Sequence, residues 1–213
     1  MLPILVKLHI ASSAMAAMTG MATPGPVMEQ AVGATLVATH YASPIEVHLY
    51  DENERRDGTL AVWRDGTTDD ATKVELKKLF HDRKTGYQKL IAKNTIAMLA
   101  AVGEMFDKTV EYVSAVRVAR GEPWESPHRA GRAVDFRIHG VSLVTIRDFL
   151  WKNYTHVGVG WYPSEQFIHI DSRPSENDCA WTFYNGTEHY HPYWAEVARQ
   201  PPKPAKPDHK AGS

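Results

Sequence analysis

Two histidines and one aspartate in this sequence have the spacing of ligands for one metal ion. His128 and Asp135 are separated by six residues in Ser-Pro-His-Arg-Ala-Gly-Arg-Ala-Val-Asp, and His169 lies in the later apolar segment Phe-Ile-His-Ile-Asp. Catalytic zinc sites commonly use three nitrogen or carboxylate ligands and leave a fourth position for water. The set therefore favours a zinc hydrolase, although two histidines and one carboxylate are also found around iron.

The segments that carry these residues alternate as half-buried strands do. In residues 133–139, Asp135 faces away from the apolar side chains, and in residues 167–171, His169 does the same. If the two strands are neighbours, Asp135 and His169 meet across the ladder, since directly opposed Cβ atoms lie about 5 Å apart. We expect His128 to join them from a proline- and glycine-containing loop that doubles back over the sheet.

The remaining periodicities predict an α+β domain. Alternation predicts a strand at residues 45–50 and, after a polar turn, a partner strand at residues 59–63. Helical spacing predicts helices within residues 69–80 and 88–106, and Ser142 is placed to cap a third helix. We expect a central, mostly antiparallel sheet with helices packed on it and the metal cleft on its open face.

Composition narrows the class of protein. The chain has 213 residues, of which 43% are apolar, so it can bury the core of one modest domain. Its formal net charge is −1 and it has no basic stripe, which argues against a nucleic-acid partner. The single cysteine, Cys179, excludes an internal disulfide and a metal site built from cysteines. The oligomeric state is left open.

Four segments are expected along the chain. In residues 1–22, Lys7 precedes a run of apolar and small residues, which is typical of a secretory signal peptide and too short to span a bilayer; a mis-assigned start or a disordered leader is the alternative. Residues 23–43 predict a linker or weak helix, residues 44–194 the domain, and residues 195–213 a Pro/Lys-rich disordered tail. Export would place the protein in the periplasm or outside the cell.

An ordered series of motifs, spanning roughly residues 44–185, resembles a known family. The series consists of the first strand, Val-Trp-Arg-Asp-Gly, His-Asp-Arg-Lys-Thr-Gly, Val-Ser-Ala-Val-Arg, the ligand motif, Gly-Val-Gly-Trp-Tyr-Pro and Phe-Ile-His-Ile-Asp. It is similar to the zinc D-alanyl-D-alanine carboxypeptidases and murein endopeptidases, which share a superfold with the hedgehog signalling domain, and especially to a bacterial branch formerly described as a domain of unknown function. The resemblance implies hydrolysis of amide bonds in peptidoglycan stem peptides or cross-links, by a carboxypeptidase or an endopeptidase of D,D or L,D specificity.

The resemblance also implies roles for individual residues. His128, Asp135 and His169 match the ligands of one zinc ion. Arg117 matches an arginine that stabilises the oxyanion in related carboxypeptidases. Ser126 matches a serine that supports the first ligand. Zinc in such a site lowers the pKa of water from about 16 to roughly 7 and polarises the scissile carbonyl.

The general base departs from the family pattern. The glutamate that better-known D,D-peptidases carry three residues before the last histidine ligand is Gln166 here, and the neighbouring Glu165 faces the opposite way in a regular strand. Asp171 shares the face of His169 and is our first candidate for the base, or for the acceptor that orients a ligand. Glu165 is the second candidate, and Trp161 or Tyr162 is expected to contact substrate.

Two other functions fit the same residues. A non-catalytic, zinc-bearing module that binds the cell wall is favoured by the missing glutamate, since the hedgehog domain shows that this fold need not be an enzyme. An enzyme acting on another amide is the third interpretation. Taken singly, Arg117 could also be a structural ion-pair partner and Asp171 could cap the turn that follows it.

Overall fold

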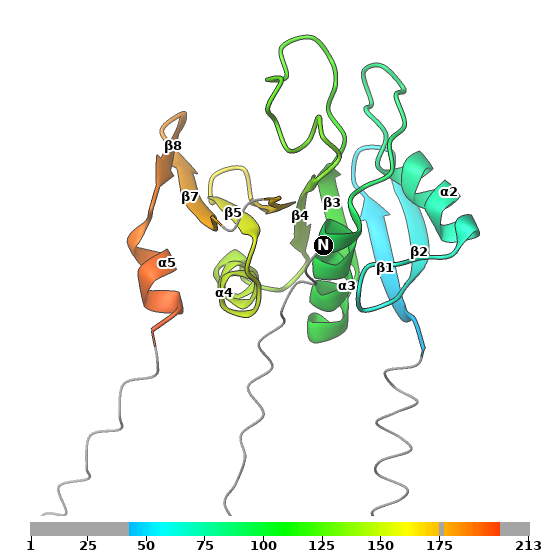
Figure 1. Cartoon of the computed structure of the whole chain (residues 1–213). Helices are drawn as coiled ribbons and strands as arrows, with labels where there is room; N and C mark the ends of the chain where they lie inside the picture. The colour runs from blue at the N-terminus through cyan, green and yellow to red at the C-terminus, as the bar shows by residue number, and fades with distance from the viewer. Residues whose placement is uncertain (1–42, 175–176, 201–213) are drawn as a thin grey trace, which may run out of the picture.

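The computed structural model describes residues 43–174 and 177–200. The expected signal peptide, all of the linker before Ser43, and residues 201–213 of the expected tail lie outside these described residues. The described chain forms one eight-stranded sheet with helices packed against it, in the strand order β2-β1-β3-β4-β6-β5-β7-β8 (Figure 1).

The bounds of the elements place both ligand-bearing segments in strands. The strands are β1 (Ile45–Asp51), β2 (Arg56–Val62), β3 (Val110–Ser114), β4 (Ala133–Ile138), β5 (Val157–Tyr162), β6 (Phe167–Ser172), β7 (Cys179–Tyr184) and β8 (Thr187–Tyr190). The helices are α2 (Asp70–Leu79), α3 (Lys93–Phe106), α4 (Leu143–Asn153) and α5 (Tyr193–Ala198). Only the pairs β1–β3 and β5–β7 are parallel among the described strands. The predicted α+β fold with a mostly antiparallel sheet is therefore confirmed.

One face of the sheet is apolar and carries the helices. Directly paired residues share a face, so the register places Val47, Val110, Phe136 and Ile170 in one layer, and all four are buried. Helices α2, α3 and α4 pack against the strands that carry this layer. The opposite face is left for the polar side chains of β4 and β6.

The start of α3 is tied to the strands that carry the ligands. The Thr95 hydroxyl donates to the Arg132 carbonyl at 2.7 Å and also lies 3.0 Å from Ser172 Oγ. The Ala92 amide donates to the Gly131 carbonyl at 2.8 Å. These bonds anchor the loop before β4 against the helix. By contrast, Ser142 precedes α4 as expected, but its side chain makes no capping hydrogen bond.

The C-terminal part of the sheet and the last helix extend the domain. Strands β7 and β8 were not expected from the sequence, and they add a hairpin beside β5. Helix α5 packs on α4, where Trp151 Nε1 donates to the Ala195 carbonyl at 2.7 Å. Ala195 and Ala198 are buried, so the packed region extends past the boundary expected at residue 194.

Asp82, between α2 and α3, joins two loops near the open face. Its Oδ2 accepts hydrogen bonds from the Val118 and Ala119 amides at 2.6 and 3.1 Å, and its Oδ1 accepts from the Lys84 and Thr85 amides at 2.9 Å each. Asp82 is only 3% exposed. Burial raises the pKa of its carboxyl, but the amide donors outweigh burial and lower the pKa to about 2. The ionised carboxylate thus fixes the loop after β3 against residues 82–85.

We expect the hydrogen bonds that Asp82 accepts to make a pH-dependent contribution to the stability of the fold. Because the folded pKa of Asp82 is depressed from 3.8, its stabilisation is complete above about pH 4 and is lost as the pH falls towards 2. Asp82→Asn should lower the free energy of unfolding by about 2 kcal/mol at neutral pH. Urea unfolding measured from neutral pH to pH 2 should show this difference shrinking. Asp70→Asn, which alters a carboxylate that is 97% exposed, serves as the control; equal losses in both variants would contradict the prediction.

Candidate metal centre

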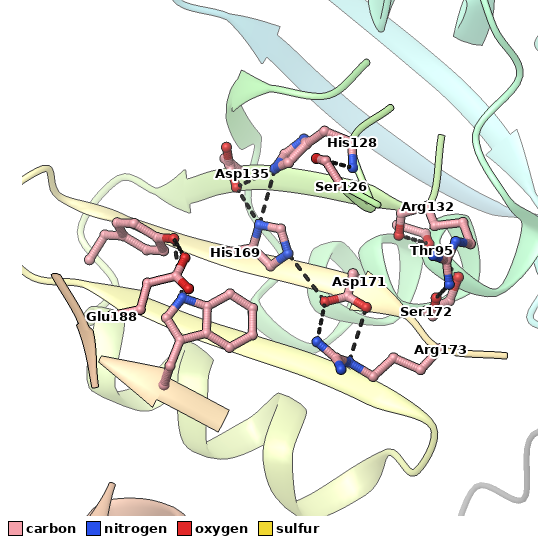
Figure 2. A network of polar contacts seen from close by, with 12 residues as sticks. Thr95, Ser126, His128, Arg132, Asp135, His169, Asp171, Ser172, Arg173 and Glu188 are labelled. Atoms are coloured by element: carbon pink, nitrogen blue, oxygen red, sulfur yellow. Dashed lines mark hydrogen bonds and ion pairs between the residues drawn. The ribbon is translucent and has the colours of Figure 1, made fainter. Parts of the chain in front are cut away.

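Three ligand atoms converge on the open face of the sheet. His128 Nε2 lies 3.1 Å from His169 Nδ1 and 3.3 Å from Asp135 Oδ1, and His169 Nδ1 lies 2.8 Å from the same Asp135 oxygen (Figure 2). All three residues are buried, and together they form a group that could hold a metal ion. The sequence expectation that these residues meet agrees with this geometry.

Strand register brings two of the three residues together. Asp135 of β4 is the direct partner of His169 of β6. His128 comes from the loop that precedes β4, where a turn is closed by bonds from the Gly131 amide to the His128 carbonyl at 3.1 Å and from the Arg132 amide to the Pro127 carbonyl at 2.8 Å. Gly131 has a φ of 69°, in the left-handed region that glycine adopts without strain. The turn directs the imidazole back over the strands.

The second nitrogen of each imidazole is already hydrogen-bonded. His128 Nδ1 lies 2.6 Å from the Ala115 carbonyl, which can only accept, so Nδ1 carries the proton and Nε2 keeps its lone pair. His169 Nε2 lies 3.3 Å from Asp171 Oδ2, which leaves Nδ1 directed at the ligand cluster. Hydrogen bonds of this kind select the tautomer and the ring orientation of histidine ligands.

The donor set fits zinc. Tetrahedral zinc with nitrogen and oxygen ligands at about 2.0–2.1 Å has neighbouring ligand atoms about 3.3 Å apart. The three separations here are 2.8 to 3.3 Å. Two imidazoles and one carboxylate would leave a position for water or substrate, as a catalytic site requires. His128, Asp135 and His169 are therefore the residues that would hold the ion.

Opposite charges stabilise the buried groups of the site. Burial raises the pKa of Asp135, but His128 and His169 outweigh this effect and hold it well below its usual range. Burial lowers the pKa of His169, yet hydrogen bonds and charge from Asp135 and Asp171 raise it to about 9. The pKa of Asp171 is lowered, because His169 and Arg173 outweigh burial. His169 thus lies between two carboxylates that both favour its charged form.

Two glycines of β5 make room for the groups around His169. A Cβ at Gly158 would lie 1.9 Å from Asp171 Oδ2, and a Cβ at Gly160 would lie 2.5 Å from Trp181 Cε2. The Trp181 ring packs against the imidazole of His169, with centroids 5.0 Å apart. The Gly-Val-Gly motif therefore allows a carboxylate and an indole to contact the same ligand.

Arg117 and Ser126 lie beside the ligands, as the family resemblance implied. Arg117 Nη1 donates to Asp135 Oδ2 at 3.3 Å, and its Nε lies 3.2 Å from Glu122 Oε2. The Ser126 hydroxyl accepts from the His128 amide at 3.2 Å and donates to Glu122. Arg117 is also 44% exposed, so its guanidinium can be reached by a bound molecule.

The ligands open into a cavity of about 370 Å³. It is lined by Arg117, Glu122, Pro123, Ser126, Pro127, His128, Tyr162, His169, Arg173, Trp181, Glu188 and Tyr190. Sequence reasoning missed the carboxylates of Glu122 and Glu188. Nothing in the sequence marks the first, and the second could be found only by recognising the β7–β8 hairpin, whose register puts Glu188 opposite Phe183 on the site face.

Three residues expected at the site do not line this cavity. Trp161 is on the helix side of the sheet, where its ring lies under the Arg147 guanidinium at 4.7 Å, because adjacent strand residues face opposite ways; its neighbour Tyr162 does line the cavity. Glu165 is exposed in the turn before β6, and the strand alternation that we applied to it does not hold there. Asp171 is buried behind His169 and does not line the cavity.

The comparisons with known proteins agree with this site. The family described as Peptidoglycan L,D-endopeptidase MepK (Peptidase_M15_2) matches residues 42–177. A probable peptidoglycan L,D-endopeptidase MepK of Haemophilus influenzae is 41% identical over 58 residues, which cover 27% of this chain and 31% of the relative. The peptidoglycan L,D-endopeptidase MepK of Escherichia coli K12 is 39% identical over 59 residues, covering 28% and 32%.

The chain thus spans about a third of the length of these curated relatives. No solved structure matches. The family match, however, covers more than half of the chain and includes all three candidate ligands. It confirms the resemblance to the zinc murein peptidases, and the chain belongs to the M15_2 peptidase family.

Proposed function

We propose that this protein is a zinc-dependent peptidase that hydrolyses amide bonds in peptidoglycan peptides. The observation that carries the proposal is the buried triad of His128, Asp135 and His169, whose ligand atoms lie 2.8 to 3.3 Å apart at the end of a cavity. Both relatives are described as L,D-endopeptidases, which supports L,D-endopeptidase activity over carboxypeptidase activity. A bound zinc ion would supply a Lewis acid for the scissile carbonyl and a more acidic water molecule.

Arg117 is the proposed oxyanion donor. It is fixed beside the ligands by Asp135 and Glu122 and remains 44% exposed towards the cavity. A guanidinium stays charged at any working pH and can donate several hydrogen bonds, which suits the developing negative charge of a tetrahedral intermediate. Its contact with Asp135 supports this role, because a donor beside the ligands would lie close to a carbonyl that is bound at the ion.

Asp171 is proposed to orient His169, the second of the roles expected for it. It is 1% exposed, and its carboxylate is occupied by His169 Nε2 and by Arg173. A group in this position cannot reach a water molecule in the cavity. Of the carboxylates that do line the cavity, Glu122 is tied to Arg117 and Ser126, whereas among the described residues Glu188 has hydrogen bonds only with the hydroxyls of Tyr162 and Tyr190. Glu188 is therefore our candidate for accepting the proton.

The proposed substrate places the activity in the cell envelope, which agrees with the signal-like residues 1–22. Within residues 43–174 and 177–200, none of the helices has the length and apolar character needed to span a bilayer. The non-catalytic cell-wall-binding module remains the alternative, and it is favoured by Gln166 at the position of the usual glutamate.

The first test is digestion of defined muropeptides by the purified protein. We expect cleavage of L,D cross-linked peptides, loss of cleavage with a chelator, and its return when zinc is added, because the water must be activated by the ion. Chromatography identifies the products, and elemental analysis counts the metal. Unchanged chromatograms for D,D and L,D substrates would overturn the proposal, and binding to sacculi without cleavage would favour the alternative module.

Loss of a metal ligand and loss of the oxyanion donor should give different defects. His169→Ala should remove both zinc and activity, since two ligands rarely retain the ion. Arg117→Ala should keep zinc and lower kcat by about 100- to 1,000-fold, the usual cost of one oxyanion donor. Lys152→Ala removes an exposed charge on α4 and is the control. Loss of zinc from Arg117→Ala would show instead that the arginine is structural.

Variants of Asp171 and Glu188 should also differ from each other in zinc binding and in turnover. Asp171→Asn should weaken zinc affinity about 10- to 100-fold, with turnover recovering at saturating zinc, because an amide orients His169 less well than a carboxylate. Glu188→Gln should bind zinc normally but lose kcat and the acidic limb of its pH profile. Zinc titration and kcat measured against pH distinguish the two. A fall in kcat for Asp171→Asn that saturating zinc does not restore would return Asp171 to the role of base.

A further inference from the structure

A second cavity, of about 420 Å³, shares a wall with the metal cleft. It is lined by residues 81–84, residues 114–117 and residues 119–122, and it has Arg117 and Glu122 in common with the metal cleft. The two cavities therefore meet at Arg117 and Glu122. A ligand in the second cavity would extend from the metal site along the loop after β3.

Both carboxylates of this cavity are already occupied by donors. Asp82 accepts from the amides of residues 84, 85, 118 and 119 and from the Thr85 hydroxyl. Glu122 lies against Arg117 Nε at 3.2 Å and accepts from Ser126. Neither carboxylate is free to neutralise a further cation in the cavity.

Some of the basic side chains that line this cavity already have partners, and others do not. Arg83 donates to the Val113 carbonyl at 2.8 Å and pairs with Asp51, while His81 faces Glu54 at 3.1 Å. The side chains of Lys84 and Arg120 are exposed and make no hydrogen bond or ion pair with any other described residue, although the backbone amide of Lys84 donates to Asp82. These two charged side chains come from different loops and line the same cavity.

Arg117 adds a third positive charge to this wall. Its Nε lies 3.2 Å from Glu122 Oε2 and its Nη1 donates to Asp135 Oδ2, so the guanidinium is held in place where the two cavities meet. Its side chain is nevertheless 44% exposed. Arg117 lines the same cavity as Lys84 and Arg120, whose side chains have no partner among the described residues.

We propose that this second cavity is a subsite for a carboxylate of the peptide substrate, held by Lys84 and Arg120. The inference rests on the proposed function, and it names the class of substrate as an acidic peptide with a free carboxylate near the scissile bond. An extended peptide advances about 3.3 Å per residue, so adjoining cavities receive groups only a few residues apart. Guanidinium and ammonium groups are the usual partners of carboxylates in proteins.

The test uses two peptides that differ only in this carboxylate. Equilibrium binding to the zinc-loaded protein is measured by calorimetry for a stem peptide with free side-chain carboxylates and for the same peptide with these carboxylates amidated. We expect Lys84→Ala/Arg120→Ala to raise Kd about tenfold for the free acid and to leave Kd for the amide nearly unchanged. Lys77→Ala/Lys152→Ala removes two positive charges outside the cavity and should alter neither Kd.

Cleavage is measured in parallel, so that the two proposals fail separately. A wild-type protein that binds the free acid more tightly than the amide but cleaves neither would sink the proposed function and leave the subsite standing. Equal losses for both peptides, or a loss matched by the control pair, would overturn the subsite, as would equal affinity of the wild type for the two peptides. Zinc content unchanged in the variant shows that the metal centre is intact.

Discussion

The pairing of Asp135 with His169 across β4 and β6 is the contact on which the whole site depends. It puts a carboxylate oxygen 2.8 Å from an imidazole nitrogen in a buried position. A slip of one residue in either strand would send that strand's ligand to the helix side of the sheet and bring Val134 or Ile170 to the site face. The apolar layer opposes such a shift, because those side chains are completely buried beneath the helices. Hydrophobic packing on one face of the sheet thus determines which side chains of β4 and β6 lie on the other.

Much of this arrangement could be predicted because it is local or periodic. Alternation in two short segments gave the faces of Asp135 and His169, and their pairing followed from the assumption that the segments were neighbours. The partners that complete the site depend on tertiary contacts rather than on local periodicity. The Ala115 carbonyl is a backbone group, which has no residue signature, and Glu188 reaches the cavity through the parallel pairing of β7 with β5. Neither can be read from spacing along the chain.

The direction of Glu165 could not be predicted, for a local reason. Strand alternation would apply to this residue only if β6 began before it, whereas the strand starts at Phe167 and Gln166 has a φ of 60°. A left-handed residue breaks the alternation of side chains, so the direction of Glu165 cannot be counted back from His169. Trp161 shows the converse. There the strand is regular, and alternation alone places it opposite Tyr162 and away from the cavity.

The hydrogen bonds around the ligands also bear on what an ion would do there. His169 lies between two carboxylates, Arg117 lies against Asp135, and the Ala115 carbonyl orients His128. Partners outside the ligand set therefore orient both imidazoles, and the sheet register accounts for the positions of Asp135 and His169. In a structural zinc site, by contrast, folding depends on the ion. Ligands supported by the sheet and by a second layer of hydrogen bonds suit a centre whose ion would serve chemistry rather than folding.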